Sequence, residues 1–152
     1  MLPQFYKFVL VNNSGQTVTF NANGRLKLKL TAWFITPATG KIHYDQLSDD
    51  DFAFVAADSM ADGAEETTTE IDNTTNLYLG LQAQLEVTHD EGAAADGTFD
   101  LYIAGGDATG ELPTDATGYG SAEAAKLRFL GSLTWEPAGI DDEVMRSEVF
   151  NL

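Results

Sequence analysis

Two segments with strict two-residue alternation constrain the fold most strongly. In 25–34 (RLKLKLTAWF), leucine, Ala32 and Phe34 alternate with basic residues, threonine and tryptophan. In 77–88 (LYLGLQAQLEVT), leucine, alanine and valine alternate with mostly polar residues. Successive side chains point to opposite faces of a strand, whereas a helix would spread this pattern around its circumference. Both segments are therefore predicted to be β-strands with one buried face.

Turn-forming residues separate further short segments of strand-like composition. Asparagine and glycine cluster at 12–15 and 21–24, and both residues readily adopt the positive φ angles of tight hairpin turns. The first three strands are therefore predicted to form a meander. One short helix is predicted at 121–125, and long surface loops are predicted at 58–66 and 105–120. The remaining strands are predicted at 5–11, 16–21, 41–47, 52–56, 67–71, 98–104, 126–135 and 144–150.

These elements predict an all-β fold class. About nine or ten short antiparallel strands are typical of a β-sandwich or jelly roll, here with long acidic loops. No repeat or linker divides the chain, so we expect a single domain over residues 1–152. A chain of this length buries roughly two-thirds of its unfolded surface. It therefore does not depend on disulfides, and it contains no cysteine.

Charge is distributed very unevenly along the chain, which has a formal net charge of −16. Residues 1–44, the basic N-terminal meander, hold five bases and no acid, whereas 45–152, the acidic remainder, holds all 24 acids and three bases. Phosphate backbones and anionic lipids repel such a chain. No apolar run is long enough to cross a bilayer, and the first residues lack the pattern of a signal peptide. We therefore expect neither nucleic acid nor a membrane as a partner.

The outward face of the strand at 25–34 is a basic ladder, Arg25, Lys27 and Lys29, that ends in Trp33. Two interpretations remain open. The ladder is either a solvated strand face, of the kind that protects a sheet edge from aggregation, or a cationic strip that orients the protein on an acidic partner. On the second interpretation, the candidate partner-binding residues are Lys7, Arg25, Lys27, Lys29, Trp33 and Lys41.

The sequence offers little chemistry. His43 and His89 are the two histidines, and no Gly-x-Ser-x-Gly nucleophile motif accompanies them. Carboxylate pairs are expected by chance among 24 acids, so they do not indicate a glycosidase. The acidic runs at 49–51 and 58–66 lack the spacing of an EF-hand calcium loop. We expect no enzymatic activity, no catalytic residue, no cofactor and no metal site.

Residues 76–135 resemble part of a known group of proteins. The alternating segment 76–87 is followed by an Ala/Gly loop at 91–97, a strand at 98–104, a Gly/Asp-rich loop at 105–110 and a further strand at 126–133. This order resembles the core hairpin and following strand of small tailed-bacteriophage virion proteins of the capsid decoration, or cement, type. The first meander does not align with that group.

The resemblance implies a function without catalysis. Capsid decoration proteins are β-sandwich domains, often trimeric, that sit on the outside of a mature phage head and clamp neighbouring subunits of the major capsid protein. It therefore implies a virion protein on the outer capsid surface, with the major capsid protein and its own copies, as a homotrimer, for partners. We expect the basic N-terminal strands to provide the capsid contact.

Two alternatives stay open. A phage tail structural component fits the same residues. A carbohydrate-binding β-sandwich module fits them as well, with acidic loops holding calcium and aromatic side chains as stacking platforms. The aromatic candidates for that role are Trp33, Tyr44, Tyr78, Tyr102 and Tyr119.

Overall fold

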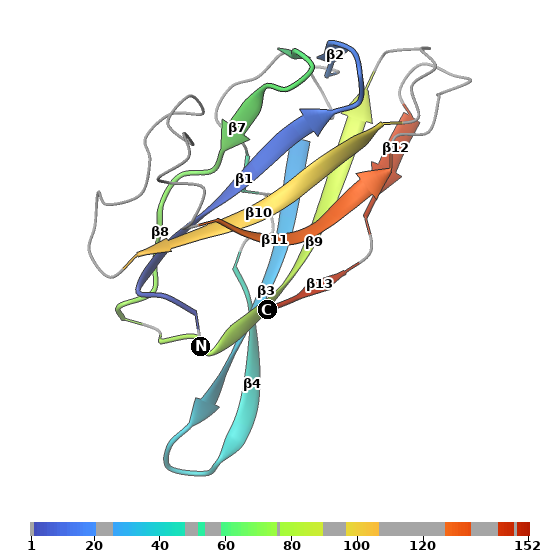
Figure 1. Cartoon of the computed structure of the whole chain (residues 1–152). Coiled ribbons are helices and arrows are strands. Elements are labelled where there is room, and N and C mark those ends of the chain that lie inside the picture. Colours follow the sequence, from blue (N-terminus) through green and yellow to red (C-terminus); the bar gives the residue numbers. More distant parts are fainter. Residues whose placement is uncertain are drawn as a thin grey trace.

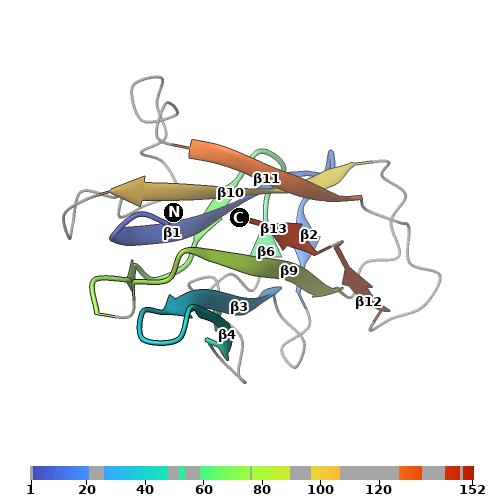
Figure 2. The same cartoon turned by 90° about the horizontal axis from the view of Figure 1, so that it is seen from below.

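Two antiparallel sheets pack face to face and enclose the alternating apolar side chains between them (Figures 1 and 2). The computed structural model describes residues 2–20, 26–47, 52–53, 59–75, 77–89, 97–106, 127–134, 143–147 and 149–152. Within these ranges every regular element is a strand. The predicted all-β, sandwich-like fold is therefore confirmed.

The first sheet has the order β11-β10-β1-β7, and β8 also pairs with β1. Its strands are β1 (Phe5–Asn13), β7 (Glu65–Thr67), β8 (Ile71–Asp72), β10 (Thr98–Gly106) and β11 (Leu127–Thr134). The second sheet has the order β12-β9-β3-β4, with β5 paired to β3 and β13 paired to β9. Its strands are β3 (Leu26–Thr36), β4 (Lys41–Gln46), β5 (Phe52–Ala53), β9 (Gly80–His89), β12 (Glu143–Arg146) and β13 (Phe150–Asn151). A separate pair joins β2 (Val18–Thr19) to β6 (Ser59–Met60).

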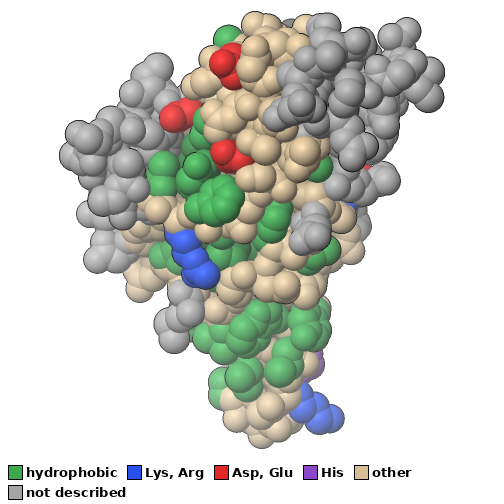
Figure 3. Space-filling model, turned by 45° about the vertical axis from the view of Figure 1, so that its right-hand side comes forward, with side chains coloured by type: hydrophobic (Ala, Val, Ile, Leu, Met, Phe, Trp, Pro, Cys, Tyr) green, Lys and Arg blue, Asp and Glu red, His purple; other side chains and the backbone are tan. Residues whose placement is uncertain are grey.

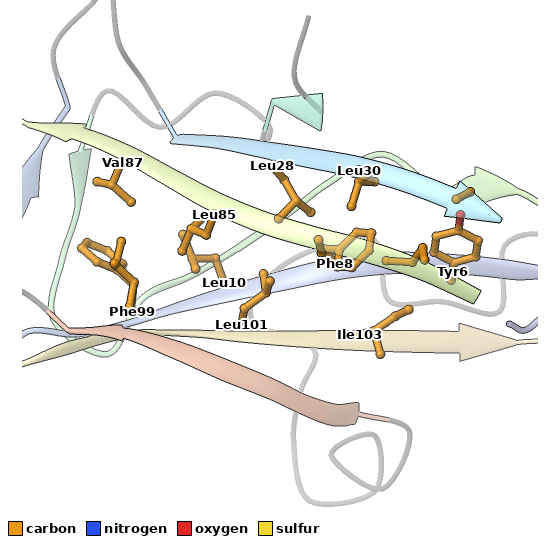
Figure 4. Packing of buried hydrophobic residues seen from close by; sticks show 14 of the residues in the cluster. Tyr6, Phe8, Leu10, Leu28, Leu30, Leu85, Val87, Phe99, Leu101 and Ile103 are labelled. Atoms are coloured by element: carbon orange, nitrogen blue, oxygen red, sulfur yellow. The ribbon is translucent and has the colours of Figure 1, made fainter. Parts of the chain in front are cut away.

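The core lies between the inner faces of four long strands (Figure 4). The alternation predicted for 25–34 and 77–88 is confirmed within β3 and β9, where alternate residues are buried. It is wrong at the start of the second segment, because Leu77 is 62% exposed whereas Tyr78 is buried. The inward side chains are Tyr6, Phe8 and Leu10 of β1, Leu28, Leu30 and Ala32 of β3, Leu81, Ala83, Leu85 and Val87 of β9, and Phe99, Leu101 and Ile103 of β10. Each large apolar side chain buried in this way contributes about 1.5–3 kcal/mol to the hydrophobic stabilisation.

The predicted N-terminal meander of residues 1–44 is wrong. β1 pairs with β10, β7 and β8 in the first sheet, whereas β3 pairs with β9, β4 and β5 in the second. The side chain of Asn12 explains where the chain leaves the first sheet. Its Oδ1 accepts a hydrogen bond from the N–H of Ser14 at 2.9 Å, and its Nδ2 donates to the carbonyl of Met60 at 2.9 Å. The chain therefore turns toward β6 instead of folding back onto β1.

The hairpin expected between the segments 77–88 and 98–104 is also wrong. These segments form β9 and β10, which belong to opposite sheets. Each strand has a continuous apolar face, and the two faces meet across the core instead of lying side by side in one sheet. The strand predicted at 126–135 does pair with β10, as β11.

Two predicted strands are interrupted by side chains that replace ladder hydrogen bonds. The segment 67–71 splits into β7 and β8, because Thr68 Oγ1 accepts the N–H of Phe8 at 3.1 Å. The segment 144–150 splits into β12 and β13, where Ser147 Oγ accepts the N–H of Leu85 at 2.9 Å. The predicted loop 58–66 contains β6 and the start of β7.

Several expectations fall outside the described residues. The helix at 121–125, most of the loop at 105–120 and Arg25 are among them. In the part of the chain that the structure describes, no helix is long and apolar enough to cross a membrane.

Tyr6 generates a prediction about stability and pH. Its side chain is fully buried, and none of the described residues offers its hydroxyl a hydrogen-bond partner. Burial raises the pKa of Tyr6 above its ordinary value, and the neighbouring Tyr78 adds to the rise. The folded protein therefore keeps this proton at a pH where the unfolded chain loses it, so stability should fall as the pH rises above about 10.

We expect Tyr6→Phe to remove most of this alkaline loss while leaving stability at pH 7 within about 1 kcal/mol of the parent, because no hydrogen bond is lost. Urea unfolding between pH 7 and pH 11 measures both effects. A loss of more than about 2 kcal/mol at pH 7 would show instead that the hydroxyl has a partner.

Candidate partner-binding site on the β3–β4 arm

The end of β3 and all of β4 form a hairpin that projects beyond the sandwich, at the foot of Figure 1. We call residues 33–44 the arm. Its turn lies at 37–40, where the N–H of Gly40 donates to the carbonyl of Thr36 at 2.8 Å. Gly40 has a φ of 65°, a left-handed conformation that glycine adopts without steric cost.

One face of the arm is an exposed apolar ladder. The register pairs Trp33 with Tyr44 and Ile35 with Ile42, so all four side chains lie on the same side of the hairpin. Ile35, Ile42 and Tyr44 are 43%, 56% and 64% exposed. Figure 3 shows hydrophobic side chains gathered over this part of the molecule. Single exposed apolar residues are normal on protein surfaces, whereas a contiguous group marks an interaction site.

The opposite face of the arm is fastened to the sandwich by aromatic side chains. Phe34 stacks on His43, with ring centroids 5.3 Å apart, and meets Tyr78 edge-on at 6.1 Å. The hydroxyl of Tyr78 donates to Asp45 Oδ2 at 2.9 Å. Burial, and then the bond to Asp45, raises the pKa of Tyr78. These contacts hold the base of the arm in one orientation and leave the ladder outward.

Trp33 lies at the base of the ladder and packs on a glycine. A Cβ added at Gly80, its register partner on β9, would overlap both the indole of Trp33 and the carbonyl oxygen of Leu152. Only glycine leaves room for the ring at this position. The indole is consequently half-buried, with one part against the sheet and the rest exposed.

Lys29 of the basic ladder is paired within its own sheet. Lys29 Nζ lies 3.0 Å from Glu86 Oε2 on the neighbouring strand, and the Glu86 side chain is only 9% exposed. Lys27 lies opposite the same glutamate in the β3–β9 register. β3 has β9 on one side and, on the other, β5 at Lys27 and β4 from Thr31 onward, so the interpretation of the ladder as protection of a sheet edge is wrong.

A shallow groove of about 280 Å³ runs beside this ion pair on the outer face of the second sheet. Thr31 and Lys29 of β3 line one part of it, and the amide side chains of Gln82 and Gln84 of β9 line another. Gln46 and the exposed Val149 complete its rim. The groove is open, and its lining is a mixture of polar and apolar surface.

The six predicted partner-binding residues therefore separate in space. Lys27, Lys29 and Trp33 share the second sheet, and Lys41 is exposed at the start of β4, next to the turn of the arm. Lys7 lies on β1 in the other sheet with only 8% of its surface exposed, so the structure does not bring it into an accessible patch. Arg25 lies outside the described residues.

The exposed isoleucines of the arm were missed at the sequence level, although a signal for them exists. The alternation of β3 stops at Ala32, after which Trp33, Phe34 and Ile35 follow without a polar residue. A strand that is apolar on both faces is normally covered on both, whereas here the face with Ile35 stays exposed, which is typical of a surface that binds a partner.

The described residues contain no group of three or more His, Asp or Glu side chains that could hold a metal ion. His43 is engaged in the stack with Phe34, and the side chain of His89 is not described. The chain matches no protein-family model, no curated protein and no solved structure.

The Lys29–Glu86 pair generates a prediction. Lys29→Glu places a second carboxylate beside a nearly buried one, so we expect a loss of about 1–3 kcal/mol, between the values for exposed and buried pairs. Lys41→Glu, on the exposed arm, should cost less than about 0.5 kcal/mol. Urea unfolding at pH 7 compares the two variants. Equal stabilities would mean that the ion pair contributes nothing to the fold.

Proposed function

We propose that this protein is a non-enzymatic structural protein of the capsid decoration type, and that it attaches to the outer surface of a phage head through the arm. The observation that carries this proposal is the exposed apolar ladder of Trp33, Ile35, Ile42 and Tyr44 on a hairpin that leaves the sandwich. The proposed partner is the major capsid protein, and the proposed location is the virion.

The arm suits docking to a protein surface for two physical reasons. Burying an exposed isoleucine or tyrosine removes apolar surface from water, worth about 1.5–3 kcal/mol for each fully buried side chain. Aromatic residues that are held in place lose little conformational freedom on binding and often dominate interfaces. Trp33 is of this kind, because its indole packs against Gly80 and the base of the arm is fixed by the contacts of Phe34 and Tyr78.

Charge also favours the arm as the point of contact. Lys41 is the one charged residue in 33–44, although the whole chain has a net charge of −16. An acidic capsid surface would be repelled by most of the chain but not by this hairpin. Because Lys29 is already paired with Glu86, apolar contacts should dominate attachment, and salt should weaken it only slightly.

The test uses phage heads purified without this protein and the full chain added back. Ile42→Ser should lower occupancy at least about tenfold, because the loss of one buried isoleucine costs more than 1.4 kcal/mol. Phe129→Ser is the matched control, since Phe129 is 54% exposed but lies on β11 in the first sheet. Equal losses for both variants would exclude the arm as the specific contact. Binding to isolated tails in place of heads would favour the tail component.

One observation favours a second candidate, a carbohydrate-binding module. The groove lined by Thr31, Gln82 and Gln84 offers amide and hydroxyl groups next to the aromatic pair Trp33 and Tyr44. Tyr78 is unsuitable as a stacking platform because it is only 7% exposed, and Tyr102 packs edge-on against Phe129 on the first sheet. Tyr119 lies outside the described residues.

A glycan array with and without calcium separates the two candidates. Binding of a glycan by the wild type that is lost in Gln82→Ala and unchanged in Ile42→Ser would favour the carbohydrate-binding module. Binding to phage heads that is lost in Ile42→Ser and unchanged in Gln82→Ala would favour the decoration protein.

A further inference from the structure

We propose that two copies of this chain pair through the free edges of their β4 strands, antiparallel and centred on His43, to form a two-fold dimer. β4 is the last strand in the order β12-β9-β3-β4, and all six of its residues are exposed. Across the described ranges, no strand pairs with its outer side. An exposed strand edge of this kind is a template for pairing with another chain.

The backbone of β4 presents the groups that such pairing needs. The N–H of Leu47 donates to the carbonyl of Leu30 at 3.0 Å, which places these two residues at a hydrogen-bonded position of the β3–β4 ladder. Hydrogen-bonded and non-hydrogen-bonded positions alternate along an antiparallel pair. The backbone N–H and C=O of His43 therefore point toward β3, whereas the backbone N–H and C=O groups of Ile42 and Tyr44 point away from β3, toward the free edge.

Pairing centred on His43 uses these outward groups. Ile42 of one copy lies opposite Tyr44 of the other, so the two residues exchange both N–H···O bonds, twice across the axis. A register displaced by one residue would set outward groups against inward ones and form no ladder. The backbone thus allows only registers that differ by steps of two.

Side-chain charge selects among these registers. With His43 at the centre, Lys41 of each copy lies directly opposite Asp45 of the other, giving two opposite-charge pairs. In one neighbouring register Lys41 faces His43, and in the other it faces Leu47. Neither brings Lys41 onto Asp45, so the centred register is the one in which the edge is complementary to itself.

The apolar ladder is also completed in this register. Ile42 meets Tyr44 of the second copy on the same face that carries Trp33 and Ile35. The paired hairpins then form a four-stranded sheet with two apolar rows, each running from Trp33 through Tyr44 to Ile42 and Ile35 of the other copy. The arm contains no acidic residue although the whole chain is strongly anionic, so repulsion between two copies is weaker there than over the acidic remainder.

The pairing does not depend on the proposed function. It predicts a dimer, whereas the resemblance noted in the sequence implies a homotrimer. It also predicts that a partner surface would meet two arms at once, on one continuous face.

Sedimentation equilibrium of the full chain tests the pairing. The wild type should reach twice the chain mass as its concentration rises. Lys41→Asp and Asp45→Lys should each weaken dimerisation at least about tenfold, because each sets two like-charged pairs across the axis. The double variant with both changes should restore it, since the opposite-charge pairs return with their signs exchanged.

Two further variants control this experiment. Arg128→Asp makes the same change of charge as Lys41→Asp at an exposed position of β11, outside the arm, so it should leave dimerisation unchanged. Ile42→Pro removes an outward N–H at a position that makes no hydrogen bond to β3, and it should abolish the dimer. Circular dichroism checks that each variant is folded.

A wild type that stays monomeric at the highest concentration, or that forms a trimer, would overturn the pairing. So would a dimer that survives both charge changes, since its interface would lie elsewhere. Loss of head binding by Ile42→Ser, with a monomeric wild type, would leave the proposed function standing while the pairing fails.

Discussion

The packing of the inner faces of β1 and β10 against those of β3 and β9 is the contact on which the other features depend. Phe8 and Leu101 on one sheet, and Leu30 and Leu85 on the other, are fully or almost fully buried. Because side chains alternate along a strand, a shift of one residue in any of these strands would turn its whole apolar row away from the core. The core therefore fixes the register of both sheets, and through β3 it fixes where the arm leaves the sandwich.

Two buried asparagines govern how the chain enters and leaves this core. Asn12 donates through Nδ2 to carbonyls of the segment around β6, and Asn73 accepts the N–H of Tyr78 at 2.8 Å while donating to the carbonyl of the same residue at 3.2 Å. An unpaired backbone group in such a place would cost about 1–3 kcal/mol. These side chains satisfy the backbone where the ladders end, so the chain can leave one sheet without orphaned groups.

The second sheet divides into a part governed by the core and a part that is not. Along β3 the residues before Trp33 follow the alternation, and Lys29 is balanced by Glu86 on β9. Phe34 still packs against the core, whereas Ile35 beyond it is exposed, so both faces of the hairpin carry apolar side chains but only one face is covered. The same strand thus supplies the stability of the domain at one end and the candidate contact surface at the other.

The sequence by itself determined the fold class, because the two-residue alternation in 25–34 and 77–88 is compatible only with half-buried strands. It also predicted Trp33 and Lys41 as partner-binding residues, and the structure places both on the arm. Strand partners were decided only by the tertiary structure. Local turn residues suggested a meander and a hairpin, but apolar faces from strands distant in sequence pair most favourably across the core. The tertiary structure likewise determined that the arm is exposed, since the exposure of Ile35 and Ile42 depends on where the sandwich ends.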